Sequence, residues 1–230
     1  MDGIFNRTEE KYLVPADKYD GLFGMLKQFM CEDEYGLQPI HNIYFDTKCD
    51  DLILRSIEKP FFKEKLRLRS YGTASGDKPV YLELKKKFGG IVYKRRMKLP
   101  YSDAKRYLSG EIPETNERIG KELNYFFSYY KMLPKLFLAY DRLALFAASD
   151  KKLRVTFDGN IRYRTECFDL SKEYSNEPYG GEKFYIMEIK ALNAMPLWLT
   201  QILTEMRLYP ASFSKYGNIY KKLHTKDFVL

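Results

Sequence analysis

The sequence predicts an α+β fold in which about eight β-strands form the main sheet. Polar and apolar residues alternate along several short segments, which is the two-residue period of a strand. Phe88-Gly89-Gly90 separates two such segments at the spacing of a hairpin. Apolar residues elsewhere recur at helical spacing. The 230 residues contain no composition break, so we expect one domain over residues 1–230.

The expected elements follow from these periods. Besides an N-terminal strand through residues 7–11, strands are expected at residues 42–47, 61–71, 80–87, 91–99, 136–147, 153–157, 161–165 and 184–190. Turns are expected at Ser149-Asp150 and Asp158-Gly159-Asn160. Helices are expected at residues 15–30, 102–108, 118–132 and 196–208, with a last helix that Ser214 caps.

The charge balance favours an anionic partner. The 39 Lys and Arg residues outnumber the 31 Asp and Glu residues, which gives a formal net charge of +8. Nucleic acid, an anionic membrane surface, a polyphosphate and a nucleotide all fit that charge. Three isolated cysteines and two histidines argue against a zinc site, and we interpret the cysteines as packing residues of a reducing compartment. No signal core or run of 18 apolar residues is found, so we expect a cytoplasmic protein.

Charged residues recur on one face of the expected strands. Residues two apart on a strand share a face. Six strand segments carry such sets: Glu9 and Lys11; Arg67 and Arg69; Glu83, Lys85 and Lys87; Lys94, Arg96 and Lys98; Arg162 and Arg164; Glu188 and Lys190. A solvated sheet face explains any one set, but it explains six less well because Arg and Lys dominate. Lys86 and Arg95 are expected to point to the opposite face.

These faces predict a binding site for a phosphate chain. If helices cover the apolar face of a curved sheet, closing the sheet turns the polar faces into the wall of a lumen. Crowded cations are unfavourable there unless a ligand with several negative charges neutralises them. Carboxylates in such a cavity suggest Mg²⁺ or Mn²⁺, for which Glu188 and Glu9 are the candidate ligands.

Nine short strings carry a family resemblance over nearly the whole chain: RTEEKY, IYFDT, RLRSYG, LELKKK, YKRRM, YDR, LRVTFD, MEIK and FSKY. The chain resembles the VTC (vacuolar transporter chaperone) polyphosphate polymerase domain, within the CYTH-like, triphosphate tunnel metalloenzyme superfamily. The resemblance implies a closed antiparallel eight-stranded β tunnel with helices packed outside. It also implies an ATP-polyphosphate phosphotransferase that uses Mn²⁺ or Mg²⁺ to transfer the ATP γ-phosphate to a growing polyphosphate chain.

The resemblance also implies the roles of individual residues. Phosphate-contacting positions of the family, which include the catalytic set, fall on Lys11, Arg67, Arg69, Lys85, Lys94, Arg142, Arg154, Lys190 and Lys215. The alternation adds Lys87 and Arg96, whereas it does not point to Arg142, Arg154 or Lys215. Tyr140 and Tyr216 match positions that donate a hydroxyl or shape the tunnel. Glu188 falls on the metal position.

The N-terminal string separates the chain from related hydrolases. Tunnel hydrolases open with ExExK, whereas this chain has Arg7-x-Glu9-x-Lys11, so a group that could orient water or a second metal is missing. This favours a transferase over a tunnel triphosphatase, with thiamine triphosphatase and class IV adenylate cyclase as weaker options. A non-catalytic polyphosphate-binding subunit is a further alternative. A nucleic-acid binder is disfavoured because the aromatic residues lie among aliphatic ones. A separate membrane protein at the inner membrane face is an optional partner.

Overall fold

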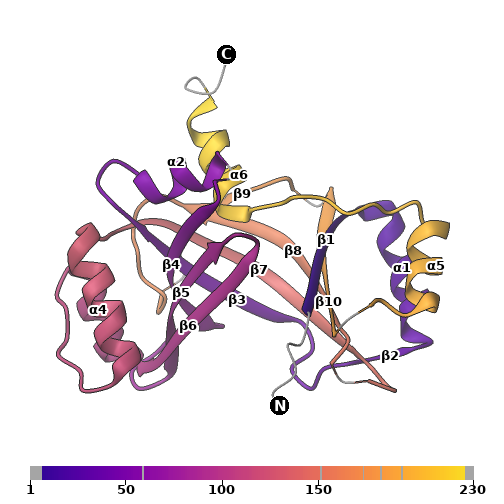
Figure 1. Ribbon diagram of the computed structural model, residues 1–230, viewed down its shortest axis with the longest axis horizontal. Coiled ribbons are helices and arrows are strands. Elements are labelled where there is room, and N and C mark those ends of the chain that lie inside the picture. Colours follow the sequence, from indigo (N-terminus) through magenta and orange to yellow (C-terminus); the bar gives the residue numbers. More distant parts are fainter. Residues whose placement is uncertain are drawn as a thin grey trace. The chain divides into compact units, whose positions relative to one another are not determined.

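The computed structural model describes residues 7–58, 60–150, 152–172, 174–181, 183–192 and 194–225. Within them the strands are β1 (Arg7–Pro15), β2 (Met30–Glu32), β3 (Gln38–Asp46), β4 (Phe62–Tyr71), β5 (Pro79–Phe88), β6 (Ile91–Pro100), β7 (Leu133–Ala147), β8 (Arg154–Arg164), β9 (Glu177–Pro178) and β10 (Phe184–Leu192). The helices are α1 (Ala16–Lys27), α2 (Asp51–Ile57), α3 (Tyr101–Leu108), α4 (Arg118–Tyr130), α5 (Leu197–Glu205) and α6 (Lys215–Leu223) (Figure 1). No helix in this part of the chain is long and apolar enough to cross a membrane.

The strands are hydrogen-bonded in the order β1-β10-β8-β7-β3-β4-β5-β6, with β2 paired to β7 and β9 paired to β8. The registers of β1, β10 and β8, and those of β3, β4, β5 and β6, are antiparallel. The expected antiparallel α+β class is therefore confirmed. Among the described residues, β1 and β6 are the two ends of the path and the sheet has ten strands in all. Closure into an eight-stranded tunnel is not confirmed.

The chain divides into two compact units, each assembled from three segments. Unit 1 contains Met1–Pro39, Tyr140–Ile161 and Pro178–Phe213, and unit 2 contains Ile40–Ala139, Arg162–Glu177 and Ser214–Leu230. Strands β7 and β8 are each divided between the two units, β7 after Ala139 and β8 after Ile161. The expectation of a single domain over residues 1–230 stays a prediction.

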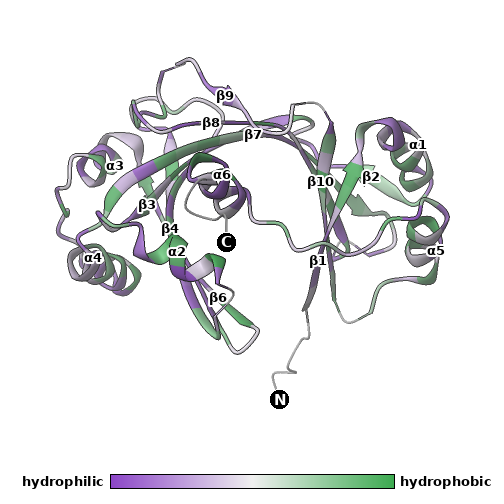
Figure 2. Cartoon of the chain, turned by 90° about the horizontal axis from the view of Figure 1, so that it is seen from above, coloured by the Kyte–Doolittle hydropathy of each residue, from purple (hydrophilic) through white to green (hydrophobic). Residues whose placement is uncertain are grey.

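In unit 1, one face of the strands packs against α1 and α5, which lie side by side (Figures 1 and 2). Leu22 and Leu26 of α1 are fully buried in a cluster that also contains Val14, Phe157 and Leu199. Because alternate strand residues enter this core, the remaining positions of the same strands face away from it. The core therefore fixes which side chains of β1, β8 and β10 are free to build a polar face.

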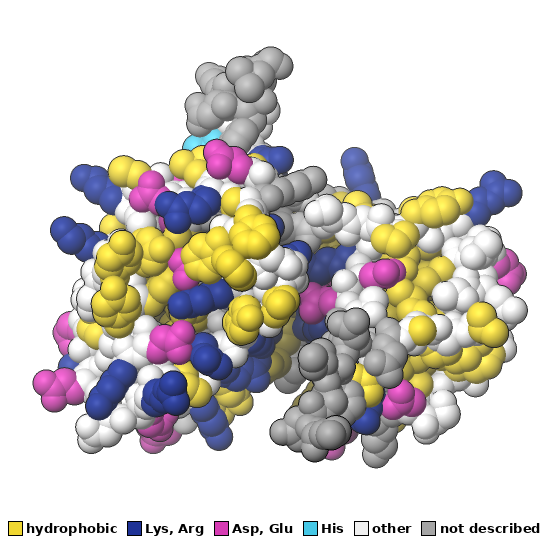
Figure 3. Space-filling model, in the orientation of Figure 1, with side chains coloured by type: hydrophobic (Ala, Val, Ile, Leu, Met, Phe, Trp, Pro, Cys, Tyr) yellow, Lys and Arg dark blue, Asp and Glu magenta, His cyan; other side chains and the backbone are white. Residues whose placement is uncertain are grey.

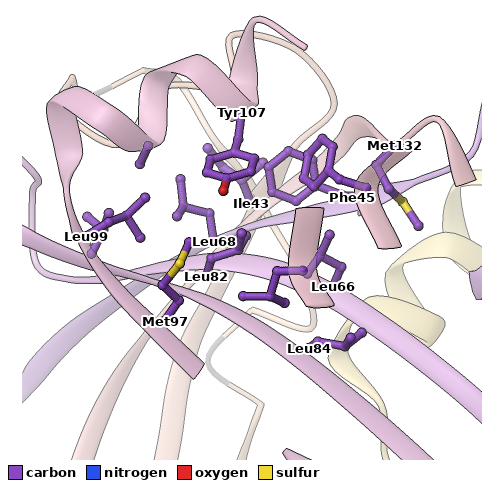
Figure 4. Packing of buried hydrophobic residues seen from close by; sticks show 14 of the residues in the cluster. Ile43, Phe45, Leu66, Leu68, Leu82, Leu84, Met97, Leu99, Tyr107 and Met132 are labelled. Carbon is purple, nitrogen blue, oxygen red and sulfur yellow. The ribbon is translucent and has the colours of Figure 1, made fainter. Parts of the chain in front are cut away.

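In unit 2, the inner face of β3, β4 and β5 packs against α3 and α4 (Figure 4). Leu66 and Leu68 of β4 pair with Leu84 and Leu82 of β5, and all four are fully buried. Tyr107 of α3 lies over the same cluster. Each such side chain stabilises the fold by about 1.5–3 kcal/mol on burial, so a one-residue register slip would be strongly disfavoured.

Three local expectations were wrong or incomplete. The turn expected at residues 158–160 is part of the continuous strand β8. Asn160 has a φ of 47° within this strand, so the turn-like residues mark a local irregularity and not the end of a strand. Helix α2 was missed because it is short, and it begins where the buried Asp46 side chain accepts hydrogen bonds from the amides of Leu52 and Ile53 at 2.9 Å. Cys31, Cys49 and Cys167 are exposed, so they are not packing residues.

Candidate functional site

In unit 2, the cation-rich face of the sheet is organised by strand register. Glu83 of β5 lies opposite Arg67 of β4 on one side and Arg96 of β6 on the other. Directly paired residues of antiparallel strands project to the same face, so these three side chains meet. The neighbouring positions Leu82 and Leu84 enter the core. The predicted alternation is thus realised here.

Glu83 is a buried carboxylate surrounded by four cations. One of its oxygens is 2.7 Å from Nη2 of Arg67 and 3.8 Å from Nη1 of Arg69, and the other is 3.0 Å from Nζ of Lys94 and 2.6 Å from Nε of Arg96. Only 1% of the Glu83 side chain is exposed. Burial raises the pKa of Glu83, but Arg67, Arg69 and Lys94 outweigh it and hold the pKa well below its usual value. The carboxylate therefore stays ionised, and the cluster keeps a net charge of +3 (four cations and one anion).

Neutral groups orient the guanidinium groups of this cluster. Arg69 donates from Nε to Asn42 Oδ1 at 3.0 Å, and Asn42 is itself buried and bonded to the carbonyl of Leu138. Arg67 donates to the Tyr44 hydroxyl at 3.2 Å. Arg96 donates to the Tyr71 hydroxyl at 3.2 Å. A fixed guanidinium presents its remaining N–H groups to an anion in a defined direction.

Tyr216, which was expected at the site, lies against this cationic face of unit 2. Its ring stacks on Tyr44 with 4.7 Å between the centroids. Lys65 Nζ lies 5.9 Å from the Tyr216 centroid and donates to Ser214 Oγ at 2.9 Å. Lys65 was missed, although it stands two residues before Arg67 and shares its face, so the alternation itself contained the signal. Lys215 is half-buried as the first residue of α6.

In unit 1, a second group of charges surrounds Glu188. Glu188 lies opposite Lys11 in the β1–β10 register, and Lys190 lies opposite Glu9. Glu188 forms ion pairs with Lys190 and, at 3.9 Å, with Lys11. Burial raises the pKa of Glu188, but Lys190 and Lys11 outweigh it and lower the pKa to about 2. The predicted metal position is thus an ionised carboxylate beside two lysines.

Arg142 and Arg154 are held by carboxylates that the sequence interpretation had not considered. Arg142 donates to Asp158 through Nε at 2.6 Å and through Nη2 at 2.7 Å, and its guanidinium lies 5.2 Å from the Tyr140 ring centroid. Arg154 donates to Asp33 at 3.0 Å. Asp158 faces away from the core because its neighbour Phe157 is in the core. It therefore belongs to the same polar face as Glu188.

One polar atom on this face stands out. Thr156 lies opposite Glu188 in the β8–β10 register, it is 3% exposed, and its hydroxyl has no hydrogen-bond partner among the described residues. A buried hydroxyl without a protein partner costs free energy, so the Thr156 hydroxyl would gain from an oxygen ligand or a cation bound at this face. Glu9 is exposed on β1, two residues before Lys11. The side chain of Arg7 lies outside the described residues.

The other charged residues lie on both faces of the unit 2 strands. Lys86 and Arg95 contact Glu122 of α4 at 3.5 and 3.1 Å, so they point to the face opposite Glu83, as expected. Lys85 and Lys87 are exposed on the Glu83 face of β5. Arg164 packs on the ring of Phe137, with 3.4 Å from its Cζ to the centroid, and binds the carbonyl of Asp169. Arg164 is therefore a packing residue, contrary to its assignment to an anion-contacting doublet.

The fold and these two groups define a class: an antiparallel α+β protein whose strand faces hold clustered cations around single ionised carboxylates. The chain belongs to the VTC domain family, whose model matches residues 6–224. Comparison with curated protein sequences gives no match.

Solved structures share the fold. One, from Bacillus halodurans and described as a candidate adenylate cyclase, is 16% identical with a TM-score of 0.58 and covers 90% of this chain and 92% of its own. Another, from Hippeastrum and described as a candidate adenylyl cyclase with a dominant triphosphatase activity, is 17% identical with a TM-score of 0.55 and covers 98% of both chains.

Proposed function

We propose that this protein is a metal-dependent polyphosphate polymerase that transfers the γ-phosphoryl group of ATP to a growing polyphosphate chain. The observation that carries the proposal is the set of four cations around the buried Glu83 carboxylate. Together with Glu83 these cations have a net charge of +3, which matches a ligand with several adjacent negative charges. Asn42, Tyr44 and Tyr71 orient the arginine guanidinium groups, which can then donate two hydrogen bonds each to such a ligand. Membership in the VTC family supports the same substrate class. The closed eight-stranded tunnel is part of this proposal.

The residues near Glu188 fit a divalent cation that arrives with its phosphate ligands. Among the described residues no three His, Cys, Asp or Glu side chains form a ready metal site. Mg²⁺ and Mn²⁺, however, commonly use one or two protein carboxylates and complete their shell with phosphate oxygens and water. Glu188 would supply the carboxylate, the partnerless hydroxyl of Thr156 a neutral oxygen, and Glu9 a second carboxylate. When bound, the metal would neutralise charge on the transferring group.

The protein's own part in the reaction is positioning and charge neutralisation. A terminal oxygen of the acceptor chain attacks the γ-phosphorus while the bond from that phosphorus to the β–γ bridging oxygen breaks, which releases ADP. In unit 1, Lys11 and Lys190, which pair with Glu188, and Arg142 would neutralise phosphoryl oxygens. In unit 2, Arg67, Arg69 and Lys94 would bind phosphate groups. Protein nucleophiles and general bases are not required.

The test uses the purified chain, ATP and Mn²⁺ or Mg²⁺, with ADP, orthophosphate and polyphosphate measured together. We expect ADP release with polyphosphate that lengthens on a gel. ADP with a stoichiometric amount of orthophosphate and no polymer would instead identify a tunnel triphosphatase. Binding of polyphosphate without ATP turnover would identify a non-catalytic subunit. Displacement of bound polyphosphate by an oligonucleotide at equal charge concentration would favour nucleic acid as the ligand.

Cytoplasmic location at the inner membrane face, next to a separate membrane protein that accepts the product, is part of the same proposal. Its support is the family membership alone. Co-purification of a membrane protein with the tagged chain from detergent extracts would test it.

A further inference from the structure

The end of the β5–β6 hairpin exposes large apolar side chains. Phe88 and Ile91 of the hairpin are 51% and 60% exposed, and Phe61, which lies next to them just before β4, is 68% exposed. Phe62, Val92 and Tyr93 are also exposed. We call these six residues the hairpin tip. Figure 3 shows apolar side chains at the surface beside Lys and Arg over this hairpin. Single exposed apolar residues are ordinary, but a contiguous group marks an interaction surface.

The hairpin tip is ordered by its own contacts. Gly89 and Gly90 form the turn with φ values of 54° and 87°, a conformation that residues with a Cβ rarely adopt. The Gly89 amide donates to the Phe61 carbonyl at 3.0 Å. The rings of Phe61 and Phe88 pack edge to face with 4.7 Å between centroids. The apolar side chains are thus presented by a defined turn.

Lysines lie immediately behind the apolar end. The register places Lys63, Lys87 and Val92 on the next rung, and Lys65, Lys85 and Lys94 two rungs further back on the same face of the sheet. Over these rungs the only carboxylate of β4, β5 and β6 is Glu64, which is buried and bonded to Tyr130 and Lys86. This arrangement matches the surface of a lipid bilayer. Apolar side chains at the end of the hairpin can reach the acyl chains, while the lysines behind them lie at the level of the anionic headgroups.

We propose that the hairpin tip docks on an anionic lipid bilayer. The six apolar side chains enter the headgroup and acyl boundary, and Lys63, Lys85 and Lys87 contact lipid phosphates. A protein partner would also cover apolar residues, but the two lysine rungs on one face favour a surface of repeated negative charge. The apolar part of this surface is separate from the proposed transferase site, because none of the six apolar residues belongs to the groups around Glu83 or Glu188, whereas Lys94 belongs to the Glu83 group.

The test measures binding of the whole chain to vesicles in a flotation assay. Vesicles of phosphatidylcholine with phosphatidylglycerol are compared with vesicles of phosphatidylcholine alone. We expect binding to the anionic vesicles only, weakening as salt rises. The double variant Phe61→Ser/Ile91→Ser should lose binding by about tenfold or more. Its matched control is Tyr125→Ser/Leu197→Ser, because Tyr125 and Leu197 are 68% and 79% exposed and lie elsewhere.

A second measurement separates insertion from other forms of contact. In a Trp198→Phe background, an Ile91→Trp variant should show a blue shift of fluorescence on anionic vesicles and quenching by lipids brominated on the acyl chain. Equal vesicle binding by the tip variant and its control would overturn the proposal, as would the absence of acyl-chain quenching. A concentration-dependent dimer in sedimentation, lost in the tip variant while vesicles fail to bind, would assign the surface to a second copy instead. Circular dichroism and denaturant unfolding like those of the wild-type chain show that the variants are folded.

Discussion

Replacing Glu83 with Gln should destabilise the protein and yet strengthen its binding of phosphate chains. The substitution keeps the shape of the side chain but leaves four cations without their shared anion. Loss of one partner from a buried ion pair costs about 3–5 kcal/mol. Arg67, Lys94 and Arg96 are 23%, 44% and 37% exposed, so water compensates in part. We therefore expect the free energy of unfolding to fall by about 2–3 kcal/mol.

The affinity should change in the opposite direction. The carboxylate and a bound phosphate compete for the same N–H donors, and the substitution raises the charge of the cluster from +3 to +4. We expect polyphosphate to bind about tenfold more tightly, which corresponds to about 1.4 kcal/mol. Denaturant unfolding gives the stability, and titration with tripolyphosphate at fixed salt gives the affinity. Glu122→Gln is the matched control, because Glu122 also binds two cations but is 36% exposed, and it should change neither quantity by more than about 1 kcal/mol.

The pH dependence provides an independent check. The pKa of Glu83 is lowered in the folded state, so its contribution to stability is fully present above the ordinary carboxyl pKa of about 4.3 and is lost as the pH falls through the lowered pKa. The stability difference between wild type and Glu83→Gln should therefore be constant above about pH 5 and shrink below pH 4. Weaker phosphate binding by the variant, or a difference that does not depend on pH, would refute the view that Glu83 is an internal substitute for the ligand.

The remaining predictions concern activity and binding. Glu188→Gln should abolish metal-dependent turnover, measured as ADP release, while polyphosphate binding survives, because only the charge that would hold the metal is lost. Arg67→Ala or Arg69→Ala should weaken polyphosphate binding by about tenfold or more and reduce its salt dependence, measured by titration at several salt concentrations. Arg7→Glu, which restores the string ExExK, should raise the ratio of released orthophosphate to phosphate incorporated into polymer at equal ATP consumption.

Each of these has a result that would count against it. Full turnover in Glu188→Gln would remove the metal assignment. Binding of polyphosphate that ignores both salt and the arginine substitutions would remove the cationic face as the binding surface. An unchanged product ratio in a folded and active Arg7→Glu variant would mean that Arg7 does not decide between transfer and hydrolysis.

The strand faces could be predicted from the sequence because a strand has only two sides. Once Leu66 and Leu68 are assigned to the core, Arg67 and Arg69 must face the other way, and the structure places them beside Glu83. The hairpin at Gly89-Gly90 could also be predicted, since two adjacent glycines permit the left-handed turn that joins antiparallel strands.

The ion pairs between strands could not be predicted in the same way. Nothing local in the sequence says that Arg142 faces Asp158 or that Arg154 faces Asp33, because these contacts depend on register between distant segments. Glu83 was expected on the charged face, but its role as the shared partner of four cations required the order β4-β5-β6. Arg164 was misassigned because alternation cannot distinguish a cation that packs on Phe137 from one that contacts a ligand.

The division of each unit into three separated segments has a consequence for synthesis on the ribosome. Unit 1 needs residues up to 213, and unit 2 needs the segment from Ser214 onward, so neither can be completed while the first half of the chain is all that has emerged. Folding must wait for contacts between segments far apart in sequence, and such chains fold slowly and expose unpaired strand edges in the meantime. A stop before Ser214 would leave Lys65 without its Ser214 partner and Tyr44 without the stacked ring of Tyr216. Helix α6 therefore joins unit 2 late: the cationic face of this unit gains the contacts of Ser214 and Tyr216 only after the residues of α6 have been synthesised.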